Sequence, residues 1–105
     1  MSADKINPDH YKSETSLECI DAMSIIFGED LVIDFCVGNA WKYIWRWKNK
    51  GGQEDLQKAN WYINKAFEKI DNPHTLYPEE EKIRQILHNM CTYIERYLIA
   101  PKGDV

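Results

Sequence analysis

Apolar residues recur at intervals of three and four along several segments of this chain, and glycine or proline separates the segments. This spacing is typical of amphipathic helices, and no segment alternates apolar and polar positions as a half-buried strand does. The breaks fall at Gly28, at Gly51-Gly52 and at Pro73. The pattern predicts an all-α fold, a small four-helix domain built on a central antiparallel helix hairpin.

The first predicted helix ends at Gly28, the usual place for a C-terminal residue with positive φ. It begins near Thr15 or Ser16, and Thr15 stands at capping-box spacing from Glu18. Its apolar residues recur at helical intervals as far as Phe27. The polar stretch before it, residues 1–15, contains an Asn-Pro pair that disfavours helix. We therefore expect that stretch to be a leader strap.

The second predicted helix runs from about Glu29 to Lys48, and the third from about Gln53 to Ile70. The short turn between them makes the two helices antiparallel neighbours. Gly38 falls in the middle of the second helix, where glycine costs on the order of 1 kcal/mol relative to alanine. A close helix crossing or a ligand near the backbone would offset that cost.

A last helix is predicted over residues 78–99, because Pro78 suits a first helical turn and Pro101 follows the end of the apolar stripe. Three glutamates after Pro78 complement the positive end of the helix dipole. A chain of this length supports one core, so residues 16–100 are expected to form a single helical domain.

Composition narrows the classes of function. Proteins that coat DNA or RNA are usually basic, so a formal net charge of −4 argues against general nucleic-acid binding. The same net charge is compatible with a local basic pocket. Cys19, Cys36 and Cys91 lie far apart in apolar segments, which predicts buried thiols in a reducing cytosol and no metal site. No signal region or membrane-spanning run appears, so a cytoplasmic protein without a membrane partner is expected.

Polar and aromatic residues recur at helical spacing on both arms of the predicted hairpin. Each helical residue turns about 100° from the one before it, so residues three, four and seven positions apart share a face. The stripes consist of Asn39, Lys42, Tyr43 and Arg46 on the second helix and Asp55, Lys58 and Tyr62 on the third.

Such stripes, facing each other across a groove, suit a nucleotide, with cations and amides for the phosphates and rings for the base. Lys50 and the N–H groups at the start of the third helix add a place for an anion in the turn. The structural alternative is that Asp55 pairs with Lys42 or Arg46 across the hairpin. Spacing alone favours this structural alternative.

Several motifs also occur in a fixed order: HYK at 10–12, ExID at 18–21, GNAxKYxxR at 38–46, KGG at 50–52 and DLxKAxxY at 55–62. With these motifs the chain resembles, over residues 7–67, a family of short bacteriophage proteins of unknown function. One branch of that family is described as a phage nucleotide kinase. The resemblance implies a phage origin, a place in the cytoplasm of an infected host cell, and nucleotide handling. It carries over Asn39, Lys42, Arg46, Asp55, Lys58 and Tyr62 as ligand-binding positions, together with His10 and Tyr11.

Three classes of function follow. The first is capture of a phosphorylated nucleotide, linear or cyclic, between the second and third helices, as a counter to host defence signalling. The second is a kinase-like or other Mg²⁺-dependent nucleotide-processing enzyme, with Asp55 as base or metal ligand and Mg²⁺ as its cofactor. The third is a helical protein-interaction module without a ligand.

Two sequence signatures of nucleotide-processing enzymes are missing or incomplete in this chain. The chain has no G-x-x-x-x-G-K-[ST] phosphate loop, and Glu18 with Asp21 supplies only half of the carboxylate set that a hard cation needs. Self-association is expected under every class, because four tryptophans and a long amphipathic last helix exceed what a thin bundle hides.

Overall fold

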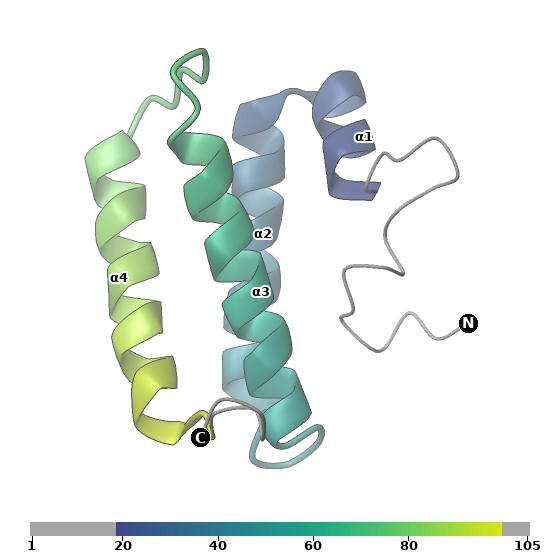
Figure 1. Ribbon diagram of the computed structural model, residues 1–105, viewed down its shortest axis with the longest axis vertical. Helices are drawn as coiled ribbons and strands as arrows, with labels where there is room; N and C mark the ends of the chain where they lie inside the picture. Colours follow the sequence, from purple (N-terminus) through teal and green to yellow (C-terminus); the bar gives the residue numbers. More distant parts are fainter. Residues whose placement is uncertain (1–18, 100–105) are drawn as a thin grey trace.

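The computed structural model describes residues 19–99, and that part of the chain is helical and contains no strand. Three long helices lie side by side and alternate in direction, with α3 between α2 and α4 and the short α1 beside the start of α2 (Figure 1). This confirms the all-α fold and its central hairpin, α2 with α3. None of the described helices is long and apolar enough to cross a membrane. The helices are α1 (Cys19–Phe27), α2 (Glu29–Arg46), α3 (Gln53–Ile70) and α4 (Glu80–Tyr97).

The helix ends differ from the prediction by at most two residues where the structure describes them. Both ends of α3 are as predicted, whereas α2 ends at Arg46 and not at Lys48. The difference arises because residues 47–52 form a turn, in which Gly52 N–H donates to the Trp47 carbonyl at 2.7 Å. The last helix occupies residues 80–97 of the predicted 78–99. The leader strap and the capping box at Thr15 lie outside the described residues.

Gly28 separates α1 from α2 as predicted. Its φ of 91° favours glycine, and its N–H donates to the Ser24 carbonyl at 3.0 Å. The apolar stripe of α1 is only partly covered, because Ile20 is buried whereas Phe27 is exposed. Periodicity placed Phe27 on the inner face, but the chain turns away at Gly28 before that face reaches the core.

The core lies on both sides of α3. Ten residues of this helix are buried, compared with six of α2 and four of α4, which makes α3 the central helix. The side chains without exposure include Ile33 and Cys36 of α2, Leu56 and Ile63 of α3, and Leu87 of α4.

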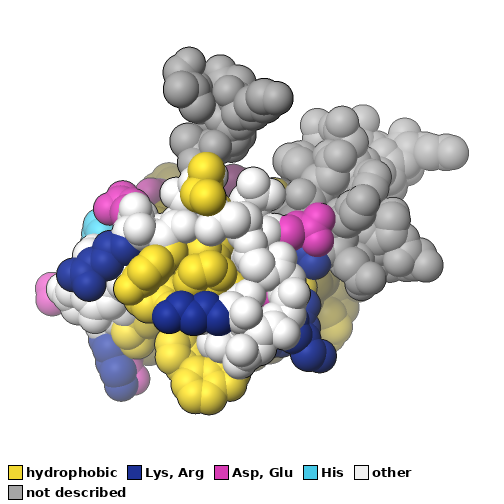
Figure 2. Space-filling view, turned by 90° about the horizontal axis from the view of Figure 1, so that it is seen from below, with side chains coloured by type: hydrophobic (Ala, Val, Ile, Leu, Met, Phe, Trp, Pro, Cys, Tyr) yellow, Lys and Arg dark blue, Asp and Glu magenta, His cyan; other side chains and the backbone are white. Residues whose placement is uncertain are grey.

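One end of the bundle is held together by contacts between the α2–α3 turn and the end of α4. The Gln53 side chain donates to the Tyr97 carbonyl at 2.8 Å and accepts from the Ile99 N–H at 2.7 Å. The Trp47 indole N–H donates to the Tyr93 hydroxyl at 3.1 Å. From this end, hydrophobic side chains form a patch near the centre of the surface, and Lys and Arg side chains lie both across this patch and towards the edges (Figure 2).

Gly38 lies on the exposed side of α2. A Cβ atom at this position would meet no atom within 4 Å. A close crossing of α2 by another helix of the same chain, one of the two explanations offered for this glycine, is therefore wrong.

We predict that Leu87→Ala lowers the free energy of unfolding by about 2–5 kcal/mol, because it leaves a cavity where α4 meets the core. Leu76→Ala is the matched control, since Leu76 is 88% exposed and its truncation should cost no more than about 0.5 kcal/mol. Urea denaturation measures both. Equal losses would mean that α4 is not part of the core.

Candidate functional site

The turn after α2 brings the backbone close to the first turn of α3. Gly52 has a φ of 59°, in the region that favours glycine. Gly51 has no room for a side chain, because a Cβ atom there would lie 2.3 Å from the carboxyl carbon of Asp55. The Gly51-Gly52 pair therefore allows the turn to lie against Asp55.

Asp55 joins the end of α2 to the start of α3. Its carboxylate is almost fully buried and accepts hydrogen bonds from Arg46 Nε at 3.1 Å, from Arg46 Nη2 at 3.4 Å and from the Gly51 N–H at 2.9 Å. Lys58 Nζ lies 4.0 Å from Oδ1 of the same carboxylate. The pairing of Asp55 with Arg46, offered as the structural alternative, is present.

Three cations lie around the ring of Tyr43. Lys42 Nζ, Arg46 Cζ and Lys58 Nζ are 4.5, 4.8 and 5.4 Å from the ring centroid, within the range of cation–π attraction. We call Lys42, Tyr43, Arg46, Asp55 and Lys58 the Asp55 cluster. Its three cations and one carboxylate have a net charge of +2, although the chain as a whole has −4.

The cations of the Asp55 cluster differ in their access to solvent. Lys42 is exposed and the Arg46 side chain is 34% exposed, whereas the Lys58 side chain is buried. Lys50, in the adjoining turn, is also exposed. An anion that approaches the Asp55 cluster from solvent would therefore meet Lys42 and Arg46, with Lys58 adding positive potential from its buried position.

Other predicted site residues are placed differently from the expectation. Tyr43 and Tyr62 are buried and stack on each other, with centroids 6.1 Å apart, so their faces form no open platform for a base. The Asn39 amide donates to the Phe35 carbonyl at 3.1 Å and is used within α2. His10 and Tyr11 lie outside the described residues.

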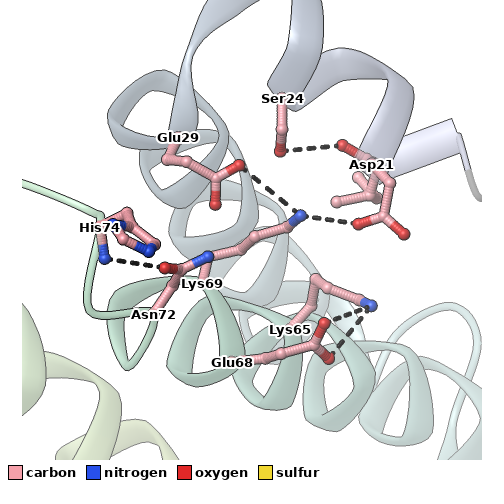
Figure 3. A network of polar contacts seen from close by, with 9 residues as sticks. Asp21, Ser24, Glu29, Lys65, Glu68, Lys69, Asn72 and His74 are labelled. Carbon is pink, nitrogen blue, oxygen red and sulfur yellow. Dashed lines mark hydrogen bonds and ion pairs between the residues drawn. The ribbon is translucent and has the colours of Figure 1, made fainter.

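A second charged network, which the sequence analysis missed, lies where α1 and α2 meet the last turns of α3 (Figure 3). Lys69 Nζ lies 2.6 Å from an Asp21 oxygen and 3.7 Å from a Glu29 oxygen. Lys65, on the same flank of α3, pairs with Glu68 at 3.2 Å. Asp21, considered above together with Glu18 as half of a metal-binding set, is thus paired with a buried lysine. Extending the stripe of Lys58 by seven and eleven positions would have found Lys65 and Lys69.

The cysteines have three different environments. Cys36 is fully buried, Cys91 is partly buried and Cys19 is exposed, so the prediction of buried thiols fails for Cys19. Burial raises the pKa of the Cys36 thiol from 9.0 to about 12, although the charges of Lys65 and Lys69 favour the thiolate. Cys36 is therefore a protonated core residue at neutral pH.

An apolar cavity of about 500 Å³ lies between α2 and α4. Its lining includes Trp41 and Trp45 from α2 and Met90 and Tyr93 from α4. Trp41 and Trp45 are 54% and 76% exposed. These two tryptophans are therefore surface residues and not part of the core.

A model of one protein family matches residues 5–64, which is more than half of the chain. The family, DUF3310, is described as proteins of unknown function. This confirms the expected resemblance to a family of unknown function. The match includes the whole Asp55 cluster and leaves α4 outside it. No curated protein and no solved structure matches the chain significantly.

We predict that Gly51→Ala lowers the free energy of unfolding by about 1–3 kcal/mol, because its methyl group would displace the buried Asp55 carboxylate. Asn49→Ala, an exposed position in the same turn, should change it by no more than about 0.5 kcal/mol. Thermal and urea denaturation test both. A Gly51→Ala chain as stable as the parent would contradict the contact with Asp55.

We predict that alkylation of the native protein at pH 8 labels Cys19 well before Cys36, because only the thiolate reacts and Cys36 is buried and protonated. The raised pKa of the Cys36 thiol also makes the stability of the fold depend on pH. Between about pH 9 and 12 the unfolded chain loses the Cys36 proton while the folded chain keeps it, so stability falls as pH rises. Mass spectrometry of the labelled peptides measures the order in which Cys19 and Cys36 react, and equal labelling rates would contradict the predicted order.

Proposed function

We propose that this chain, which belongs to the DUF3310 family of proteins of unknown function, binds the phosphate groups of a nucleotide at the Asp55 cluster. The observation that carries the proposal is the net charge of +2 around Tyr43 in an acidic chain. Cations gathered in this way repel one another, and a bound anion relieves that repulsion.

Asp55 gives the site its geometry. Because two guanidinium nitrogens of Arg46 are directed to its carboxylate, the plane of the guanidinium is fixed before any ligand arrives. A fixed planar donor binds phosphate at a smaller entropy cost than a mobile one. Lys42 and Lys50, on the exposed side, then supply mobile charges that close on the same phosphates.

The contacts of Asp55 support binding without turnover. As a general base or a Mg²⁺ ligand, Asp55 would have to release hydrogen bonds from Arg46 and Gly51. Among residues 19–99, no group of three or more His, Cys, Asp or Glu side chains is placed to hold a metal ion. A kinase-like enzyme is therefore the weaker candidate.

The resemblance to phage proteins gives this binding its proposed use. In an infected cell, a small protein that holds a host signalling nucleotide would weaken a defence response by lowering the free concentration of the nucleotide. Stoichiometric capture requires tight binding and no chemistry. Because Tyr43 and Tyr62 stack on each other, the phosphates supply most of the recognition in this proposal.

We predict that a screen of mono-, di-, tri- and cyclic nucleotides finds at least one that raises the melting temperature, with a stabilisation of about 2.7 kcal/mol at a hundredfold excess over Kd. The matching nucleoside, which lacks phosphate, should give no shift. The ligand recovered after denaturation should be intact. Conversion of the ligand, or phosphate transfer from ATP, would show that the protein is an enzyme and would contradict capture. The absence of a melting-temperature shift with any nucleotide would refute nucleotide binding itself.

We predict that Lys42→Ala weakens binding of that nucleotide about tenfold, which corresponds to about 1.4 kcal/mol. Lys42 is exposed and lies over Tyr43, so its loss should change the free energy of unfolding by no more than about 0.5 kcal/mol. Lys82→Ala is the matched control, an exposed lysine on α4. Calorimetric titration measures all three proteins, and equal affinities for the two variants would place the ligand elsewhere.

A further inference from the structure

α2 has an apolar surface on the side opposite its buried residues. Leu31, Phe35, Trp41 and Trp45 are all exposed, by 42% to 76%. At about 100° per residue they fall within roughly 120° of the helix circumference, and Gly38 lies at the centre of that arc. We call these five residues the outer face of α2.

Gly38 has no role in the packing of the chain on itself. A Cβ atom there would meet only open space, yet glycine in a helix costs on the order of 1 kcal/mol relative to alanine. A helix from another molecule would use the missing side chain, because two helix backbones approach each other most closely where both lack a Cβ.

We propose that the outer face of α2 is the interface of a two-fold symmetric dimer of this chain, in which the two α2 helices are antiparallel and cross at Gly38. Such an interface is self-complementary, because each residue meets the one equally far on the other side of the axis. Trp45, seven residues after Gly38, comes level with Leu31 of the second copy. Trp41, three residues after it, comes level with Phe35 of the second copy.

The charged residues of α2 favour an antiparallel over a parallel arrangement of the two helices. Asp34 and Lys42 are exposed, four residues before and four after Gly38. In the antiparallel pair, Lys42 of one copy comes level with Asp34 of the other, so opposite charges meet on both flanks. In a parallel pair crossing at Gly38, each residue would meet its own copy, and like charges would face each other. Asp34 is held in place by a hydrogen bond from the Tyr77 hydroxyl.

The surface is large enough for such a dimer. The exposed parts of its four apolar side chains amount to roughly 500 Å², given that an aromatic side chain presents about 150–250 Å². A standard interface buries about 800 Å² per partner, and about 65% of that area is apolar in homodimers, so the apolar area required is close to the area available. The apolar cavity between α2 and α4, which shares Trp41 and Trp45, extends the surface on one flank.

Sedimentation of the full chain at about 100 μM, without nucleotide, tests the proposal. The parent should sediment as a dimer, and Gly38→Leu should weaken the association at least about tenfold, because leucine separates the two backbones. Leucine at this position meets open space in the single chain and favours helix, so the variant folds. Asn64→Leu, on the exposed side of α3, is the matched control and should remain dimeric.

A parent chain that sediments as a monomer would overturn the proposal, and so would a Gly38→Leu dimer as tight as the parent, since it would place the interface elsewhere. The pairs of Asp34 with Lys42 add a second expectation, weaker association at high salt. Because nucleotide is absent from the experiment, the outcome does not depend on the proposed ligand.

Discussion

A buried carboxylate is stable only when hydrogen bonds and opposite charges replace the water it has lost. At Asp55 these partners come from three consecutive parts of the chain: Arg46 at the end of α2, the Gly51 N–H in the turn, and Lys58 one turn further along α3. The hairpin therefore has one arrangement that satisfies the carboxylate. The same contacts fix the positions of the cations, so the structural and the ligand-binding interpretations of this charge stripe describe one set of interactions.

The pattern of apolar residues was sufficient for the helices and for much of the hairpin. Both ends of α3 follow from the glycine pair before it and from Asp71-Asn72-Pro73 after it. The ion pair between Arg46 and Asp55 could be named as one of two options, because helical spacing puts each residue on the facing side of its helix. Spacing gave no means of choosing Arg46 over Lys42, since that depends on where the turn places Asp55.

Other features depend on contacts between distant parts of the chain. Lys69 is buried because α1 and the start of α2 supply Asp21 and Glu29 as partners, and neither is near it in sequence. Trp41 and Trp45 are two of the four tryptophans that were expected to exceed what a thin bundle hides, and only the position of α4 shows that these two are exposed. Periodicity identifies which residues share a face of a helix, but not which face another helix will cover.

α2 thus contributes three surfaces, an inner one to the core, a flank with Arg46 to the Asp55 cluster, and the outer face. The proposed binding of nucleotide phosphates at the Asp55 cluster is tested most directly by titrating the nucleotide into isotope-labelled protein and following the backbone amide signals by NMR. We predict that the largest shift changes occur at residues 42–46 and 50–58. Changes confined to the tryptophans and to α4, or no changes with any nucleotide, would contradict the account.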